Sequence, residues 1–177
     1  MDHLLECAEA FEQLLDVQYH IVLGRKNQLT ELTLRFDPTE FHHLVGLHKL
    51  RDLRLARGNR EKIFYQILSK TICMEDIKKN RYFPEIQDRI DPFDKIEHFL
   101  DSNKLIFRHT EEGHFFCRSF FQKGEKDYTK GQAIYTLLKK EKTILSTGKT
   151  MVQYDRLMSG KIQKQPALLT QNGSSHF

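Results

Sequence analysis

The first part of the chain shows two hydrophobic periods, one helical and one extended. Over residues 3–16 apolar side chains recur every three or four positions, the spacing of an amphipathic helix. Residues 19–23 are mostly apolar, and residues 29–36 alternate apolar with polar side chains, which is typical of half-buried strands. The segment between them contains glycine and asparagine, so we predict a helix followed by a β-hairpin. The helical stripe consists of Leu4, Ala8, Phe11 and Leu15.

Helix signals follow the hairpin. Residues 37–40 read Asp-Pro-Thr-Glu: the aspartate can cap free backbone N–H groups, proline suits a first turn, and glutamate favours the positive end of the helix dipole. They predict a helix over residues 38–50 or a little beyond. After a break, an asparagine can cap a second helix over residues 59–69, and residues 74–101 have the pattern of several short helices.

Beyond Asn103 the apolar pattern changes to period two, in four short runs that short polar or glycine-containing segments connect. Short connections favour antiparallel neighbours, and we expect a turn at residues 139–142. We therefore predict an α+β fold: an N-terminal helix and β-hairpin, several helices, then a four-stranded antiparallel sheet with helices packed on one face. Whether the hairpin extends that sheet is left open. The four predicted strands are residues 105–108, 115–121, 133–138 and 143–146.

Length and composition are those of one ordinary globular domain. The chain has 177 residues, 39% hydrophobic and 29% charged. We place a single α+β domain at residues 3–158 and a polar, flexible tail at residues 159–177. No apolar run approaches the roughly 20 residues that span a bilayer, and the N-terminus does not have the pattern of a signal peptide. Three widely spaced cysteines exclude a complete disulfide framework and a CxxC motif, which indicates a reducing, cytoplasmic location.

The net charge of +4 is unevenly distributed, because residues 103–177 carry a strong basic excess and residues 1–102 a slight acidic one. A basic half favours a polyanionic partner, although lysine-rich surfaces also serve solubility. Residues 49–62 form a second basic segment, because basic residues there outnumber acidic ones. The basic residues are Lys49, Arg51, Arg54, Arg57, Arg60 and Lys62, and the acidic ones are Asp52 and Glu61. Arginine binds phosphate in a bidentate manner, so anion binding is our interpretation, with a solvated helix end as the alternative.

The segment richest in candidate catalytic side chains is Phe41-His-His-Leu-Val-Gly-Leu-His-Lys-Leu-Arg-Asp52. Histidine can accept and donate a proton near neutral pH, and lysine can hold a phosphate oxygen. On a continuous helix His48 lies within the apolar stripe, His42 and Lys49 lie together on its flank, and His43 lies about 140° from His48. A glycine at position 46 is unfavourable there, and close approach of a backbone or a ligand would explain it.

These histidines have two other interpretations, a structural one and a metal site. A histidine in an apolar stripe is often a core side chain that donates to a carbonyl. A helical zinc pair needs the i, i+4 spacing of HExxH, and these histidines do not have it, so we predict no metal site.

Further candidates lie on the predicted strands. Arg118 and Ser119 are neighbours in the aromatic-rich run 115–121 and point to opposite faces of that strand. Arg118 can steady the charge that develops on phosphorus, or it can be structural. The segment 147–150, Thr-Gly-Lys-Thr, lacks the upstream glycine of a P-loop, which leaves Lys149 and Thr150 as weak phosphate contacts.

The run from Phe41 to Asp52 resembles a motif of phage-associated nuclease-like domains, which are grouped with the barnase, EndoU, colicin and RelE-type ribonucleases. The order of elements over residues 3–150 is similar as well. The resemblance implies helices packed on an antiparallel sheet and RNA cleavage without a metal. In that chemistry the 2′-hydroxyl attacks the adjacent phosphorus, assisted by a base, an acid and cations. The functional positions that the resemblance implies are His43, His48 and Lys49, with Arg118 on the sheet.

The predicted function is therefore a metal-independent endoribonuclease-like domain without a cofactor, phage- or toxin-related, with RNA as its partner and no membrane. Because the helical wheel separates His43 from His48, we expect His48 and Lys49 to act together. The remaining substrate contacts would be His42, Arg51, Arg54, Ser119, Lys149 and Thr150. The alternatives are a noncatalytic nucleic-acid-binding module, and a protein-interaction or inhibitor domain with structural histidines. An antidote or another protein partner is compatible with each of them.

Overall fold

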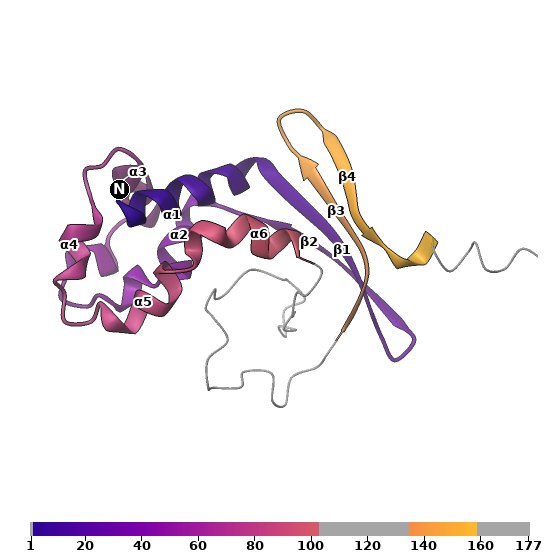
Figure 1. Cartoon of the computed structure of the whole chain (residues 1–177), viewed down its shortest axis with the longest axis horizontal. Helices are drawn as coiled ribbons and strands as arrows, with labels where there is room; N and C mark the ends of the chain where they lie inside the picture. Colours follow the sequence, from indigo (N-terminus) through magenta and orange to yellow (C-terminus); the bar gives the residue numbers. More distant parts are fainter. Residues whose placement is uncertain (1, 103–134, 159–177) are drawn as a thin grey trace, which may run out of the picture.

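The computed structural model describes residues 2–102 and 135–158, which form helices at one end of the molecule and a sheet at the other (Figure 1). Within these two ranges no helix is both long and apolar enough to cross a membrane. In chain order the elements are α1 (His3–Glu12), η1 (Gln13–Asp16), β1 (Val17–Arg25), β2 (Gln28–Arg35), α2 (Pro38–Leu44), η2 (Leu47–Lys49), η3 (Arg54–Arg57), α3 (Arg60–Leu68), α4 (Met74–Lys78), α5 (Pro84–Ile90), η4 (Phe93–Lys95), α6 (Ile96–Asp101), β3 (Thr136–Ile144) and β4 (Lys149–Asp155).

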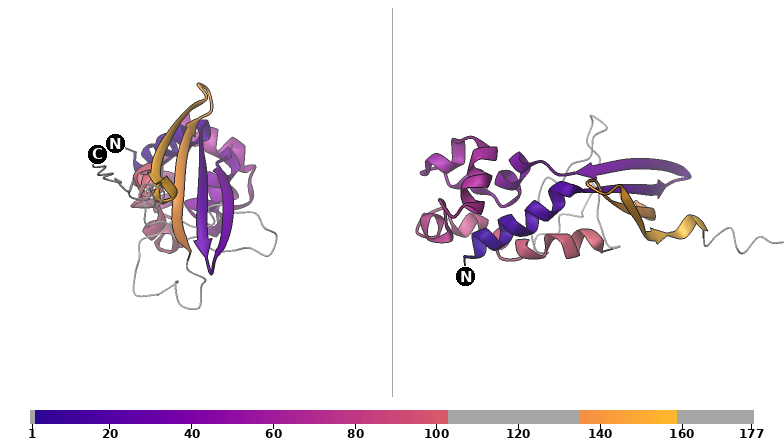
Figure 2. Two further views of the ribbon diagram at one scale, coloured as in Figure 1. Left: turned by 90° about the vertical axis from the view of Figure 1, so that its right-hand side faces the viewer. Right: turned by 90° about the horizontal axis from the view of Figure 1, so that it is seen from above.

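The predicted α+β class and four-stranded antiparallel sheet are confirmed, and the hairpin is part of the sheet. The strand order is β2-β1-β3-β4, with every neighbouring pair antiparallel. Tyr19 on the central strand β1 faces Leu34 of β2 and Lys142 of β3. Seen face on, the strands lie in front of the helices (Figure 2, left). The hairpin therefore supplies half of the sheet, a point that the sequence left open.

The prediction of a turn at residues 139–142 is wrong, because β3 runs through this segment as one strand. Its charged side chains look like those of a solvent-exposed turn, yet Lys140 is 0% and Lys142 6% exposed. Each ammonium is buried because α6 and the residue after it supply oxygen acceptors. The predicted strands 105–108 and 115–121 and the predicted tail 159–177 lie outside the described residues.

Phenylalanines from five segments meet at the centre of the helical end. Phe11 of α1 lies in ring contact with the other four, at centroid distances between 5.5 and 6.2 Å. Buried aromatic side chains contribute large apolar areas, so this contact fixes the helices relative to one another and to the end of β2. The five are Phe11, Phe36, Phe41, Phe64 and Phe93.

The start of α2 is as predicted, but its end is not. Asp37 accepts from the Thr39 N–H at 2.9 Å, and Glu40 accepts from the Asp37 N–H at 2.9 Å, which completes a capping box. The helix ends at Leu44 rather than near Leu50, because Gly46 adopts the left-handed conformation with φ +86°. A short 3-10 turn, η2, follows in a new direction.

Candidate functional site

Gly46 forms the turn that builds the candidate site. Its positive φ is one that a glycine adopts without steric strain. A Cβ at this position would lie 2.8 Å from Cγ2 of Ile86, so α5 also packs directly against the turn. The glycine that looked out of place in a helix therefore ends that helix and lets α5 approach.

The turn brings together two histidines that the helical wheel had separated. The rings of His43 and His48 are stacked, with centroids 4.4 Å apart and planes 12° apart. The predicted separation of the two rings by about 140° is wrong, because it assumed a continuous helix. Both residues are half-buried, so the pair lies at the boundary between the core and solvent.

His42 lies in the interior instead. It is 1% exposed, and its Nε2 lies 2.7 Å from the backbone oxygen of Leu55. Burial lowers the pKa of His42, and the charges of Arg60 and His43 act in the same direction, while the hydrogen bond to Leu55 partly offsets them. The ring that we expected to contact substrate therefore meets protein atoms in this conformation. The core-histidine interpretation fits His42 better than His48.

His48 has the most perturbed imidazole of the three. Burial, and after it the nearby charges of His43, Arg89, His42 and Lys49, together lower its pKa to about 4. The part of this shift that comes from neighbouring cations would favour an anion, whereas burial disfavours a charge of either sign. Its Nδ1 is buried without a hydrogen-bond partner among the described residues, so the inner nitrogen of the ring is unsatisfied.

Two cations from different segments flank the histidines. The Lys49 Nζ donates to the backbone oxygen of Glu85 at 3.1 Å, an exposed contact that ties η2 to the start of α5. Arg89 of α5 packs beside Gly46, and its charge acts on His48. Sequence reasoning missed Arg89, because nothing in the local pattern of α5 links it to a motif some forty residues earlier in the chain. Only packing brings it here.

The other predicted contacts are dispersed. Arg51 and Arg54 are exposed near the histidine turn, and the guanidinium of Arg51 lies 5.7 Å from the centroid of the Tyr82 ring. Lys149 and Thr150 lie on the β3–β4 hairpin, which Figure 1 shows well away from α2 and α5. The two remaining candidates, Arg118 and Ser119, lie outside the described residues.

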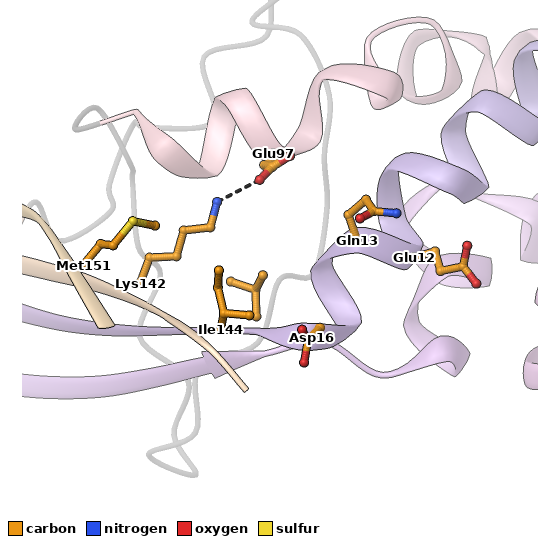
Figure 3. A pocket seen from close by; sticks show the side chains of 8 residues that line it. Glu12, Gln13, Asp16, Glu97, Lys142, Ile144 and Met151 are labelled. Atoms are coloured by element: carbon orange, nitrogen blue, oxygen red, sulfur yellow. Dashed lines mark hydrogen bonds and ion pairs between the residues drawn. The ribbon is translucent and has the colours of Figure 1, made fainter. Parts of the chain in front are cut away.

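A hollow lies elsewhere, between α1, α6 and the sheet (Figure 3). Its volume is about 360 Å³, and carboxylates outnumber cations on its wall, which does not suit a phosphodiester. Neither this hollow nor a smaller one beside the β1–β2 turn is lined by the histidines. The lining residues of the larger one are Glu12, Gln13, Asp16, Val17, Glu97, Lys142, Ile144 and Met151.

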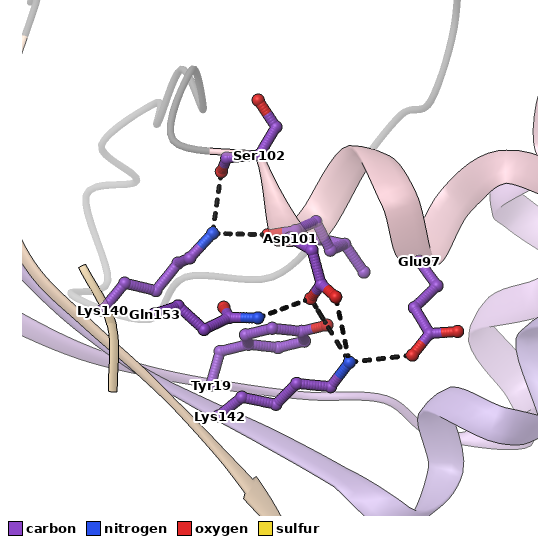
Figure 4. Close-up of polar contacts among 8 residues, drawn as sticks. Tyr19, Glu97, Asp101, Ser102, Lys140, Lys142 and Gln153 are labelled. Atoms are coloured by element: carbon purple, nitrogen blue, oxygen red, sulfur yellow. Dashed lines mark hydrogen bonds and ion pairs between the residues drawn. The ribbon is translucent and has the colours of Figure 1, made fainter. Parts of the chain in front are cut away.

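A partly buried polar network next to this hollow was also missed from the sequence (Figure 4). Asp101 at the end of α6 accepts from the Tyr19 hydroxyl at 2.9 Å and from the Lys142 ammonium at 3.2 Å. Lys140 donates to the backbone oxygens of Leu100 and Ser102 at 2.9 and 2.8 Å. These contacts satisfy two buried ammonium groups and hold α6 on the sheet, so we assign the network to the fold.

A comparison with known proteins agrees with the resemblance of the histidine segment. A family model described as phage-Barnase-EndoU-ColicinE5/D-RelE like nuclease4 matches residues 3–113. The match covers most of the chain, from α1 through α6, and includes the stacked histidines. The chain belongs to this family of nuclease-like domains. No curated protein and no solved structure matches it.

Proposed function

We propose that this nuclease-family domain is a metal-independent endoribonuclease that acts at the stacked pair of His43 and His48. The 2′-hydroxyl of the substrate loses its proton to one imidazole, and its oxygen attacks the adjacent phosphorus. The bond from phosphorus to the 5′-oxygen breaks, and that oxygen takes a proton from an acid. The products are a 2′,3′-cyclic phosphate and a free 5′-hydroxyl.

The observation that carries the proposal is the 4.4 Å stack itself. Two imidazoles this close repel each other if both are protonated, so the doubly protonated state of the pair is disfavoured. One ring can then act as base while the other acts as acid. The pKa of His48, about 4, leaves this ring unprotonated near neutral pH, so His48 is the candidate base and His43 the candidate acid.

The cations next to the pair suit the charge that develops on phosphorus. Lys49 and Arg89 come from η2 and α5 and already influence His48 electrostatically. A bound phosphodiester would partly offset these charges and raise the pKa of His48, which would improve it as a base. Arg51 and Arg54 are candidate contacts for neighbouring phosphates, and Arg118 remains a proposed stabiliser of the phosphorane.

The test is cleavage of a defined RNA in the presence of EDTA, with wild-type protein and the variants His48→Ala and His43→Ala. We expect products that end in a cyclic phosphate, no cleavage when the 2′-hydroxyl is replaced by hydrogen, and a loss of at least ~100-fold in each variant. The matched control is His98→Ala, since His98 is exposed on α6. Full activity of His48→Ala protein would eliminate this mechanism.

A noncatalytic nucleic-acid-binding module is the second candidate, and the low pKa of His48 favours it, because a base this weak removes a hydroxyl proton poorly. It predicts binding that weakens steeply with salt while the RNA remains intact. A cytoplasmic, phage- or toxin-related role is a further proposal. It rests on the cysteine pattern and on the description of the family.

A further inference from the structure

Two inner nitrogens of the histidine cluster are buried without a hydrogen-bond partner among the described residues. They are Nδ1 of His42 and Nδ1 of His48. Buried polar atoms in folded proteins are nearly always paired, with protein or with ordered water, because an unpaired one loses its solvation without compensation. Two such atoms on neighbouring rings therefore indicate a shared partner.

The protonation of His42 follows from its one hydrogen bond. A carbonyl oxygen only accepts, so Nε2 of His42 must donate to Leu55, at 2.7 Å. The ring is neutral near pH 7, because burial and the charges of Arg60 and His43 disfavour a second proton. In a neutral imidazole with a proton on Nε2, Nδ1 is a lone pair. His42 thus presents a buried hydrogen-bond acceptor.

The rings of His42 and His48 are placed for a bridge rather than a direct bond. Their centroids lie 6.4 Å apart, with planes tilted by 41°. Two hydrogen bonds of about 2.9 Å that meet at one water oxygen can span such a gap. Of the other neighbours that act on His48, Arg89 and Lys49 are hydrogen-bond donors and cannot accept a proton from Nδ1. The ring of His43 is stacked face to face on His48, with planes 12° apart, so its in-plane lone pair does not point at Nδ1.

We propose that His42 is the positioning residue of the pair: through one bridging water, its Nδ1 lone pair holds His48 in the tautomer with the proton on Nδ1. Nε2 of His48 is then the nitrogen that carries the free lone pair. When it takes a proton from the substrate, the ring becomes an imidazolium, and the bridge to His42 stabilises the Nδ1 proton. The role as base rests on the proposed function, whereas the tautomer does not.

The first measurement is the nitrogen NMR spectrum of the histidine rings in the wild-type protein at neutral pH. The protonated and unprotonated nitrogens of a neutral imidazole resonate far apart, so the spectrum identifies the tautomer directly. We expect His48 to carry its proton on Nδ1. A proton on Nε2, or an even mixture of tautomers, overturns the proposal without any variant being made.

Two substitutions of His42 separate positioning from packing. In His42→Asn the amide oxygen replaces the Nδ1 acceptor, whereas in His42→Gln the amide nitrogen replaces the Nε2 donor to Leu55. We expect the asparagine variant to keep the tautomer of His48, and the glutamine variant to lose it and to fall about tenfold in kcat/KM. If His42 had a purely structural role, the glutamine variant, which keeps the hydrogen bond to Leu55, would be the less affected of the two. If wild-type protein shows the tautomer but cleaves no RNA, the proposed function fails and the positioning role of His42 stands.

Discussion

Replacing Gly46 by alanine tests the turn on which the candidate site depends. An alanine in the left-handed conformation is destabilising by about 1–2 kcal/mol, because its Cβ crowds the following carbonyl. The new Cβ would also lie 2.8 Å from Cγ2 of Ile86, inside van der Waals contact and in a closely packed core. Overpacking of this kind typically costs about 1–3 kcal/mol. We therefore expect Gly46→Ala to lower the free energy of unfolding by about 2–5 kcal/mol.

The chain offers a matched control at Gly148, which also has a positive φ, +66°, but has nothing within 4 Å of an added Cβ. Gly148→Ala should lose only the backbone contribution of about 1–2 kcal/mol. Urea unfolding of both variants measures the difference, which isolates the contact with Ile86. Equal losses in the two variants would refute the close approach of α5 to the turn, and with it the placement of Arg89 beside the histidines.

Two electrostatic predictions follow from the same structure. Burial raises the pKa of Asp101, but its hydrogen bonds and the charge of Lys142 outweigh burial, so the pKa is lowered overall. The carboxylate therefore stabilises the fold above roughly pH 4, and this stability is lost as the pH falls. Asp101→Asn should flatten the acid side of the stability curve from urea unfolding, and an unchanged acid side would contradict the network. By NMR titration the pKa of His48 should be about 4. Arg89→Gln should raise this pKa, and Arg81→Gln, which removes an exposed arginine paired with Asp52, should leave it unchanged.

Signals within a few residues predicted the local elements correctly. The apolar stripe of residues 3–16, the hairpin, and the Asp37 cap of α2 are all present, because each depends on neighbours in the sequence. The resemblance of the histidine segment to a nuclease family is confirmed for the same reason, since the motif is contiguous. The predictions failed where the position or burial of a residue depends on a partner far away in the chain.

The clearest failed prediction concerns two buried charged side chains in β3. We predicted a turn at Lys140 and Lys142 because a lysine-rich segment usually faces water. Their acceptors belong to α6 and the residue after it, roughly forty residues earlier in the chain. The prediction for the candidate site failed for a similar reason. A helical wheel places His43 and His48 apart, because it has no means of including a left-handed residue between them.

The sequence by itself determined the class of fold, the starts of the helices, the hairpin and the family, since these depend on periodicity and on contiguous motifs. Tertiary structure alone decided that Gly46 reverses the chain against Ile86, that two imidazoles stack beside Arg89, and that the third histidine is sealed inside. The physical reason is that a side chain's position follows from local backbone geometry, whereas its neighbours and its protonation depend on segments far away in the chain that fold against it.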